Sequence, residues 1–209
     1  MDLSIQKLSK AFNQKKVFSN ISLEIHSGSR LAITGSNGSG KSTLLKILSG
    51  GQLPSAGKII YHLNGILIPE DQVFRYVHVV APYNTVIEEL TLPELFSMHQ
   101  KLGTLLHFQS CRQWMDALQY SFPWDHRIKT FSSGMKQRVK LGLAMLDSRP
   151  LILLDEPGTN LDSQGKEWFF TLFKMVSARQ TIIIATNDQQ ERAICDQELQ
   201  VEAYSQSGN

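Results

Sequence analysis

A glycine-rich segment lies between the apolar run 31–34 and an expected helix over 42–48, and its spacing matches the pattern G-x-x-x-x-G-K-[ST]. Glycines allow consecutive backbone N–H groups to turn toward an anion, because no Cβ crowds the turn. The helix adds the positive end of its dipole. The segment is therefore predicted to bind the phosphates of a nucleoside triphosphate. The residues expected to contact the nucleotide here are Gly35, Ser36, Asn37, Gly38, Ser39, Gly40, Lys41, Ser42 and Thr43.

Two side chains at the end of this segment have distinct expected roles. Lys41 is predicted to reach the β- and γ-phosphates, and the Ser42 hydroxyl to bind Mg²⁺. A purely structural glycine turn is the alternative interpretation. The order of strand, glycine loop and helix favours the phosphate site.

A second segment with chemical potential is the apolar run 151–154, which ends in the carboxylates Asp155 and Glu156. A buried parallel strand with an acidic tip is the plain structural interpretation. Ligands of parallel sheets bind outside the carboxyl ends of the strands, so chemistry is expected at the same tip. Asp155 is predicted to hold Mg²⁺ through water, and Glu156 is predicted to polarise the water that attacks the γ-phosphate.

Alternating strand and helix patterns surround both segments. Strands are expected over 21–25, 31–34, 58–61, 76–80, 151–154 and 181–185, and helices over 42–48, 135–146, 163–177 and from about 188. The middle differs, because a capping box at Thr91 opens a helix to about Lys101 and a second helical pattern covers 111–120. These patterns predict an α/β fold with a mostly parallel sheet, an N-terminal antiparallel β subdomain and a helical insertion over roughly 85–133. The whole of 1–209 is expected to be one domain.

Composition limits the partners and the compartment. The 209 residues include 21 basic and 19 acidic side chains, and this balance gives no support for nucleic-acid binding. The basic clusters Lys15-Lys16 and Lys136-Gln137-Arg138 are expected on solvated faces. Two cysteines form no disulfide or zinc pattern, and no apolar run is long enough to span a bilayer. A soluble, cytoplasmic protein is predicted.

Ser132, Ser133 and Gly134 precede the helix expected over 135–146, and they form a second predicted anion site from hydroxyls, free N–H groups and a helix dipole. A plain serine-capped helix is the alternative. Placed between the glycine segment and the acidic strand, 131–138 resembles the signature sequence of the ATP-binding cassette (ABC) family. The family usually has Leu-Ser-Gly-Gly-Gln there, and this chain keeps the first serine and second glycine.

The resemblance extends over nearly the whole chain, because 155–157 and Asn160-Leu161-Asp162 fall in family order. It implies a P-loop NTPase (RecA-like) core, with Phe12 as the aromatic residue that stacks on adenine. It also implies ATP and Mg²⁺ as ligands and a head-to-tail homodimer. In that dimer each ATP lies between the glycine loop of one subunit and the signature serine of the other. Separate transmembrane permease subunits are the implied membrane partners, and the form of the signature resembles exporter-type members.

Two positions depart from the family pattern. Family members usually place a histidine after the strand 181–185 to contact the γ-phosphate, and here the residue is Asn187. An amide can donate a hydrogen bond but cannot become a cation. The usual glutamine after the strand 76–80 is also missing, and Asn84 is the residue that could replace it. A slow ATPase is therefore expected, with Glu156, Lys41 and Asn187 as its catalytic residues.

The expected function is that of an ATP-binding and ATP-hydrolysing subunit that energises a transporter from the inner face of the cell membrane. An ATP-dependent regulatory or dimerisation module with little hydrolysis is the alternative, motivated by Asn187 and the missing glutamine. A cassette protein acting on nucleic acid or the ribosome is a third hypothesis. No charge stripe, second cassette or long coiled-coil insertion supports it.

Overall fold

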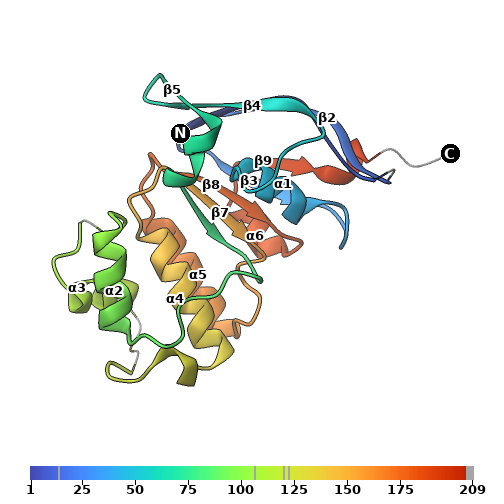
Figure 1. Cartoon of the computed structure of the whole chain (residues 1–209). Helices are drawn as coiled ribbons and strands as arrows, with labels where there is room; N and C mark the ends of the chain where they lie inside the picture. Colours follow the sequence, from blue (N-terminus) through green and yellow to red (C-terminus); the bar gives the residue numbers. More distant parts are fainter. Residues whose placement is uncertain (14, 106, 120, 122, 206–209) are drawn as a thin grey trace. The chain divides into compact units, whose positions relative to one another are not determined.

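The structure is a computed structural model of the chain (Figure 1), and it describes every residue except 14, 106, 120, 122 and 206–209. The chain folds into two compact units, each built from segments that are distant in the sequence. The first unit comprises Met1–Val79, Pro150–Glu156 and Ser177–Asn209, and the second comprises Val80–Arg149 and Pro157–Val176.

The first unit contains a four-stranded antiparallel sheet with the strand order β2-β1-β4-β5. Its strands are β1 (Asp2–Phe12), β2 (Lys15–Ile25), β4 (Ala56–Leu63) and β5 (Ile66–Ile68). Side chains at the start of β1 alternate in burial, because Leu3 and Ile5 are buried and Ser4 between them is partly exposed, as a sheet with one buried face requires. The predicted antiparallel β subdomain is confirmed. The patterns at 21–25 and 58–61 identify only parts of β2 and β4.

A five-stranded sheet forms the rest of the first unit's framework, with the order β6-β7-β8-β3-β9. Its strands are β6 (Val77–Val80), β7 (Leu151–Asp155), β8 (Thr181–Ala185), β3 (Arg30–Thr34) and β9 (Gln197–Gln200). The pairs β7–β8, β8–β3 and β3–β9 are parallel. All residues of β7 and β8 are buried, which explains their unbroken apolar sequences. The predicted α/β class is confirmed.

Short helices complete the first unit: α1 (Lys41–Leu48), α6 (Gln189–Ala193) and the 3₁₀ turns η1 (Glu70–Arg75) and η3 (Val201–Tyr204). One hydrophobic core unites this unit, with side chains from both sheets and from α1. Leu3 of β1, Leu44 of α1 and Leu153 of β7 are representative, and each is fully buried. The loop between β3 and α1 is thus fixed at both ends by packed elements.

The second unit is helical. It contains α2 (Leu92–Lys101), α3 (Cys111–Leu118), the 3₁₀ turn η2 (Ile128–Thr130), α4 (Ser133–Met145) and α5 (Ser163–Met175). The predicted capping box is present, because the Thr91 N–H donates to Glu94 Oε2 at 2.8 Å. Trp114 of α3 is fully buried against Phe96 of α2, with ring centroids 6.1 Å apart. The expected end of this helix at position 120 lies outside the described residues.

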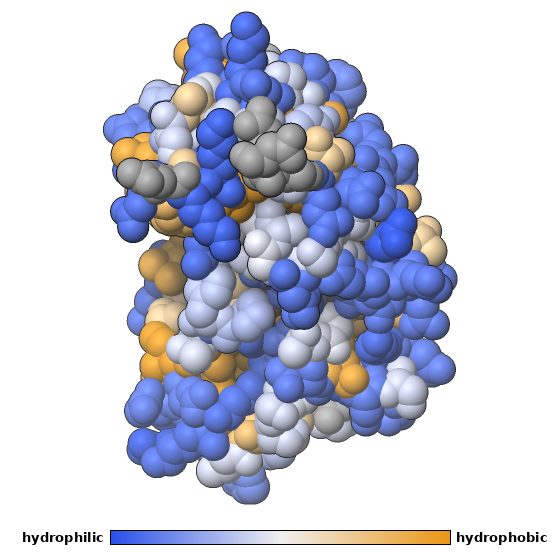
Figure 2. Space-filling view, turned by 90° about the vertical axis from the view of Figure 1, so that its right-hand side faces the viewer, coloured by the Kyte–Doolittle hydropathy of each residue, from blue (hydrophilic) through white to orange (hydrophobic). Residues whose placement is uncertain are grey.

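The surface shown in Figure 2 is largely hydrophilic, with hydrophobic side chains in small, separate groups. Among the residues that the structure describes, no helix is long and apolar enough to cross a bilayer.

Candidate functional site

The glycine segment forms the turn between β3 and α1. Gly35, Gly38 and Gly40 have φ angles of 141°, 84° and 109°, a backbone region that side chains with a Cβ rarely adopt. A Cβ on Gly40 would also lie 2.4 Å from Val17 Cγ1 of β2. Glycine is therefore required here both for the backbone conformation and for the close approach of β2.

Lys41 begins α1 and is only 5% exposed. Its ammonium donates to the Gly35 carbonyl at 2.7 Å and to the Ser36 carbonyl at 3.2 Å. The positive charge thus lies within the curve of the loop. A bound phosphate would meet this charge together with the N–H groups at the start of α1.

The glycine loop also contains a buried serine hydroxyl, and a glutamate side chain from the C-terminal segment contacts it. Ser39 Oγ is buried and, among the described residues, has no hydrogen-bond partner. A buried hydroxyl of this kind suits an oxygen ligand that enters the loop. On another part of the loop, the Ser36 N–H donates to Glu202 Oε1 of η3 at 2.8 Å. Hydrogen bonds from the Ser36 side chain and backbone lower the pKa of the Glu202 carboxyl. No sequence signal identified Glu202, because its contact depends on how the C-terminal segment folds back.

Asp155 lies at the end of β7 and is 4% exposed. Burial raises the pKa of this carboxyl, while a hydrogen bond with the Ser42 side chain and the charge of Lys41 act in the opposite direction. Ser42 and Asp155 are therefore in contact and present two oxygen donors. Mg²⁺ is typically bound by one or two such side chains together with water and phosphate oxygens. These residues fit the predicted metal.

Glu156 follows β7 directly and leaves the sheet. Its φ of 48° is left-handed, which is uncommon for a residue with a side chain, and its N–H donates to the Ala185 carbonyl at 2.8 Å. The side chain is half-buried. Backbone strain of this kind is concentrated at functional sites.

Asn187 follows β8, and the structure brings it to the glycine loop. Its Nδ2 donates to Asn37 Oδ1 at 3.4 Å, and both side chains are exposed. The next residue, Asp188, accepts from the Gln190 N–H at 2.8 Å and so caps α6. The substituted amide therefore lies at the loop, held by the turn between β8 and α6.

Phe12 lies at the end of β1 in the same unit. Its ring is 49% exposed, with the Lys10 ammonium 4.9 Å from its centre. The position leaves a ring face available for stacking, and adenine stacking stays a prediction.

The predicted signature residues belong to the second unit. Ser132 caps α4 by accepting from the Met135 N–H at 3.2 Å, and Ser133 is the first helical residue. A cavity of about 230 Å³ is lined by Ser132, Gly134 and residues of the loop 157–162. A Cβ on Gly134 would lie 3.0 Å from the Asn160 carbonyl oxygen, so this loop approaches the helix closely.

One expectation about this helix is wrong. Gln137 and Arg138 were expected to face solvent, but they are buried at 5% and 6% exposure. Both side chains form hydrogen bonds with polar groups on neighbouring segments. Lys136 is half-buried and pairs with Glu88 at 2.6 Å.

Asn84, the predicted substitute for the missing glutamine, also belongs to the second unit. It closes a turn in which its N–H donates to the Ala81 carbonyl at 3.0 Å. Its own carbonyl accepts from the Lys140 ammonium at 3.3 Å. A ligand role for the Asn84 side chain stays a prediction.

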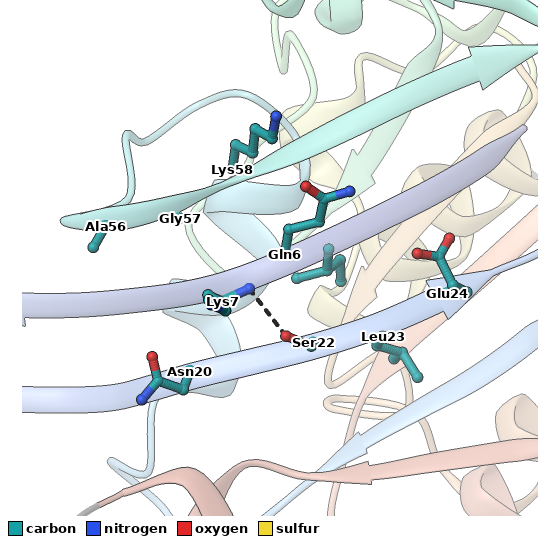
Figure 3. Close-up of a pocket in the computed structure, with 10 residues that line it drawn as sticks. Gln6, Lys7, Asn20, Ser22, Leu23, Glu24, Ala56, Gly57 and Lys58 are labelled. Carbon is teal, nitrogen blue, oxygen red and sulfur yellow. Dashed lines mark hydrogen bonds between the residues drawn. The ribbon is translucent and has the colours of Figure 1, made fainter.

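A larger groove, of about 980 Å³, lies over β1, β2 and β4 and contains none of the predicted site residues (Figure 3). It coincides with irregular strand pairing, where Lys7 and Asn20 adopt left-handed φ angles of 50° and 59°. The Lys7 N–H donates to the Ser22 hydroxyl at 3.0 Å instead of to a ladder carbonyl (Figure 3). The groove is explained by these bulges.

The sequence matches the ABC transporter family over residues 18–159. It is 30% identical to a protein of Haemophilus influenzae named as a probable ABC transporter ATP-binding/permease protein, over 96% of this chain and 38% of that protein. It is 31% identical to the lipoprotein-releasing system ATP-binding protein LolD of Saccharophagus degradans, over 83% of this chain and 80% of that protein.

The fold also matches a solved structure, the ATP-binding cassette MJ0796 captured as a dimer with ADP and Pi. The TM-score is 0.77, with 21% identity over 95% of this chain and 94% of that one. At this identity the likeness concerns the fold alone. The glycine loop, the acidic end of β7 and the family match agree, and the chain belongs to the ABC transporter family.

Proposed function

We propose that this chain binds and hydrolyses ATP as the energising subunit of a transporter whose membrane-crossing part is formed by separate permease subunits. The observation that carries the proposal is the grouping of Lys41, Ser42 and Asp155, with Glu156 next in the chain. The Lys41 ammonium lies inside the glycine loop, and the Ser42 side chain forms a hydrogen bond with the Asp155 carboxyl. Phosphoryl transfer depends mainly on such positioning and charge.

Each residue has a defined part in the proposed reaction. Lys41 and the loop N–H groups bind and orient the phosphates, while Ser42 and Asp155, the latter through water, would hold Mg²⁺. That ion would neutralise phosphate charge when bound. Glu156 orients a water molecule and accepts its proton as the water attacks the γ-phosphate.

Asn187 sets the expected speed of the reaction. Its amide is already at the loop through Asn37 and can donate a hydrogen bond to the γ-phosphate, but it cannot supply a positive charge. Removing one transition-state donor lowers the rate by roughly 10²–10³-fold in other hydrolases. We therefore propose a slow ATPase that depends on its partners.

The active form is proposed to be a head-to-tail homodimer. Ser132, Ser133 and Gly134 would contact the ATP held by the glycine loop of the second copy, with Phe12 stacked on adenine. The exposed serines at the N-terminal end of α4 and the polar cavity beside them support this role. The helical unit is where the permease subunits would dock, which would place the chain at the inner face of the membrane. The nearly neutral net charge of +2 gives no support for a nucleic-acid partner.

Purification from membranes tests the partnership. A tagged copy of the chain is expected to bring down a protein with several membrane spans. Phosphate release from that complex is expected to exceed release from the chain alone. A matched preparation of Glu156→Gln should contain the same partner but release no phosphate. Recovery without any membrane protein, together with ATP binding and no turnover, would contradict the proposal and favour a regulatory module.

A further inference from the structure

Two buried polar side chains on α4 have no part in the site described so far. Gln137 and Arg138 are 5% and 6% exposed, and they follow the signature residues on the same helix. Arginine is almost never this deeply buried unless it is paired. Both side chains contact the loop 157–162, at opposite ends.

Gln137 holds the beginning of this loop. Its Nε2 donates to the Pro157 carbonyl at 2.8 Å, and the contact is buried. Pro157 is the residue directly after Glu156 in the chain. The amide of Gln137 therefore fixes the carbonyl of the peptide that leads away from the predicted general base.

Arg138 holds the end of the loop. Its Nη2 donates to Asp162 Oδ1 at 3.4 Å, and the same Asp162 oxygen accepts from the Gly165 N–H at 2.7 Å, so that it caps α5. The guanidinium also lies 5.4 Å from the centre of the Trp168 ring. A Cβ on Gly165 would lie 2.9 Å from Asp162 Oδ1 and 3.1 Å from Arg138 Nη2, which shows how closely these groups fit.

Trp168 extends the arrangement to the rest of the helical unit. Its Nε1 donates to the Leu118 carbonyl at the end of α3, at 2.5 Å. The Leu118 side chain in turn packs on α4, where a Cβ on Gly142 would lie 2.4 Å from Leu118 Cδ2. The signature helix, the loop 157–162 and α3 are therefore joined by consecutive contacts.

We propose that Gln137 and Arg138 are positioning residues that clamp the loop 157–162 to the signature helix. This inference rests on the proposed function. Pro157 follows Glu156 directly in the chain, so the clamp fixes the peptide that leaves this residue. Neither side chain touches ATP, so the clamp acts on the rate of hydrolysis and not on nucleotide affinity.

A double-mutant cycle tests the clamp. Arg138→Met keeps the buried stem but removes the hydrogen-bond donors. Asp162→Asn removes the charge but still caps α5, because asparagine is a good N-cap residue. Each is expected to lower kcat roughly 10- to 100-fold, as displacement of a catalytic group does, with KM for ATP within about twofold of the wild-type value. The double variant is expected to fall no further than the worse single variant, because the two residues act as one unit.

Arg112→Met on the exposed face of α3 is the matched control, and its kcat is expected to equal that of the wild type. Thermal unfolding checks that each variant is folded, and if Arg138→Met is not, Asp162→Asn decides. Unchanged kcat in folded variants, losses that multiply in the double variant, or a rise in KM without a fall in kcat would overturn the clamp. These rates are measured on the chain purified with its membrane partner, and absence of phosphate release from the wild-type complex would instead overturn the proposed function, and the clamp with it.

Discussion

Replacing Lys41 with methionine removes the ammonium from the glycine loop and keeps the buried stem. The ammonium donates to the carbonyls of Gly35 and Ser36 at 2.7 and 3.2 Å. Hydrogen bonds to charged groups contribute about 1.5–3 kcal/mol each. Loss of two such contacts to the β- and γ-phosphates is worth about 3–6 kcal/mol, and about 1.4 kcal/mol corresponds to tenfold in affinity. The Kd for ATP is therefore expected to rise at least 100-fold.

The same substitution is expected to destabilise the protein in the absence of nucleotide. The two loop carbonyls lose their donor, which costs about 1–3 kcal/mol where water cannot replace it. Isothermal titration calorimetry measures the Kd, and urea unfolding without nucleotide measures the free energy of unfolding. Lys58→Met on the exposed outer face of β4 is the matched control and is expected to change neither quantity. A Kd for Lys41→Met within about threefold of the wild-type value would refute the assignment of the loop as the phosphate site.

Three further predictions concern the same unit. Burial raises the pKa of Asp155, so the folded protein holds this proton more strongly than the unfolded chain does. The resulting stability is present below the ordinary pKa of aspartate and is lost as the pH rises through the raised value. Asp155→Asn is therefore expected to increase the free energy of unfolding at pH 7 without nucleotide, by about 1.4 kcal/mol for each pH unit by which burial raises the pKa. A lower free energy of unfolding than that of the wild type, measured by urea unfolding, would contradict this prediction. Asn187→His is expected to raise kcat for phosphate release, and an unchanged kcat would show that a cation is not needed there. Gly40→Ala is expected to lower the thermal unfolding midpoint more than Gly38→Ala. Both glycines have positive φ, but a Cβ on Gly40 would lie 2.4 Å from Val17 Cγ1, whereas no atom lies within 4 Å of a Cβ on Gly38. Equal unfolding midpoints for the two variants would contradict this prediction.

Features specified by local sequence were predictable. The capping box at Thr91 depends on residues three positions apart, and β8 is an apolar run bounded by polar residues, so both were predicted correctly. The glycine segment needs backbone angles that only glycine adopts readily, and its residues form the expected strand–loop–helix turn.

Features that depend on distant contacts were not predictable. β9 has the sequence Gln-Glu-Leu-Gln, in which only Leu199 is buried, and it is a strand because it pairs with β3 at the edge of the sheet. Glu202 contacts the glycine loop across 166 positions of sequence. Arg138 was expected in solvent because lysine, glutamine and arginine in succession are polar. Its burial follows from the Trp168 ring and the Asp162 carboxylate, which come from another helix and its cap.

The most direct test of the proposed function is steady-state phosphate release with Mg-ATP from the purified chain, measured over a range of protein concentrations beside Glu156→Gln. A dimeric ATPase predicts release that rises more steeply than linearly with concentration, because two copies complete each site. Glu156→Gln is expected to bind ATP and form a stable dimer without release. Release that is strictly proportional to concentration, or that persists in Glu156→Gln, would contradict the account.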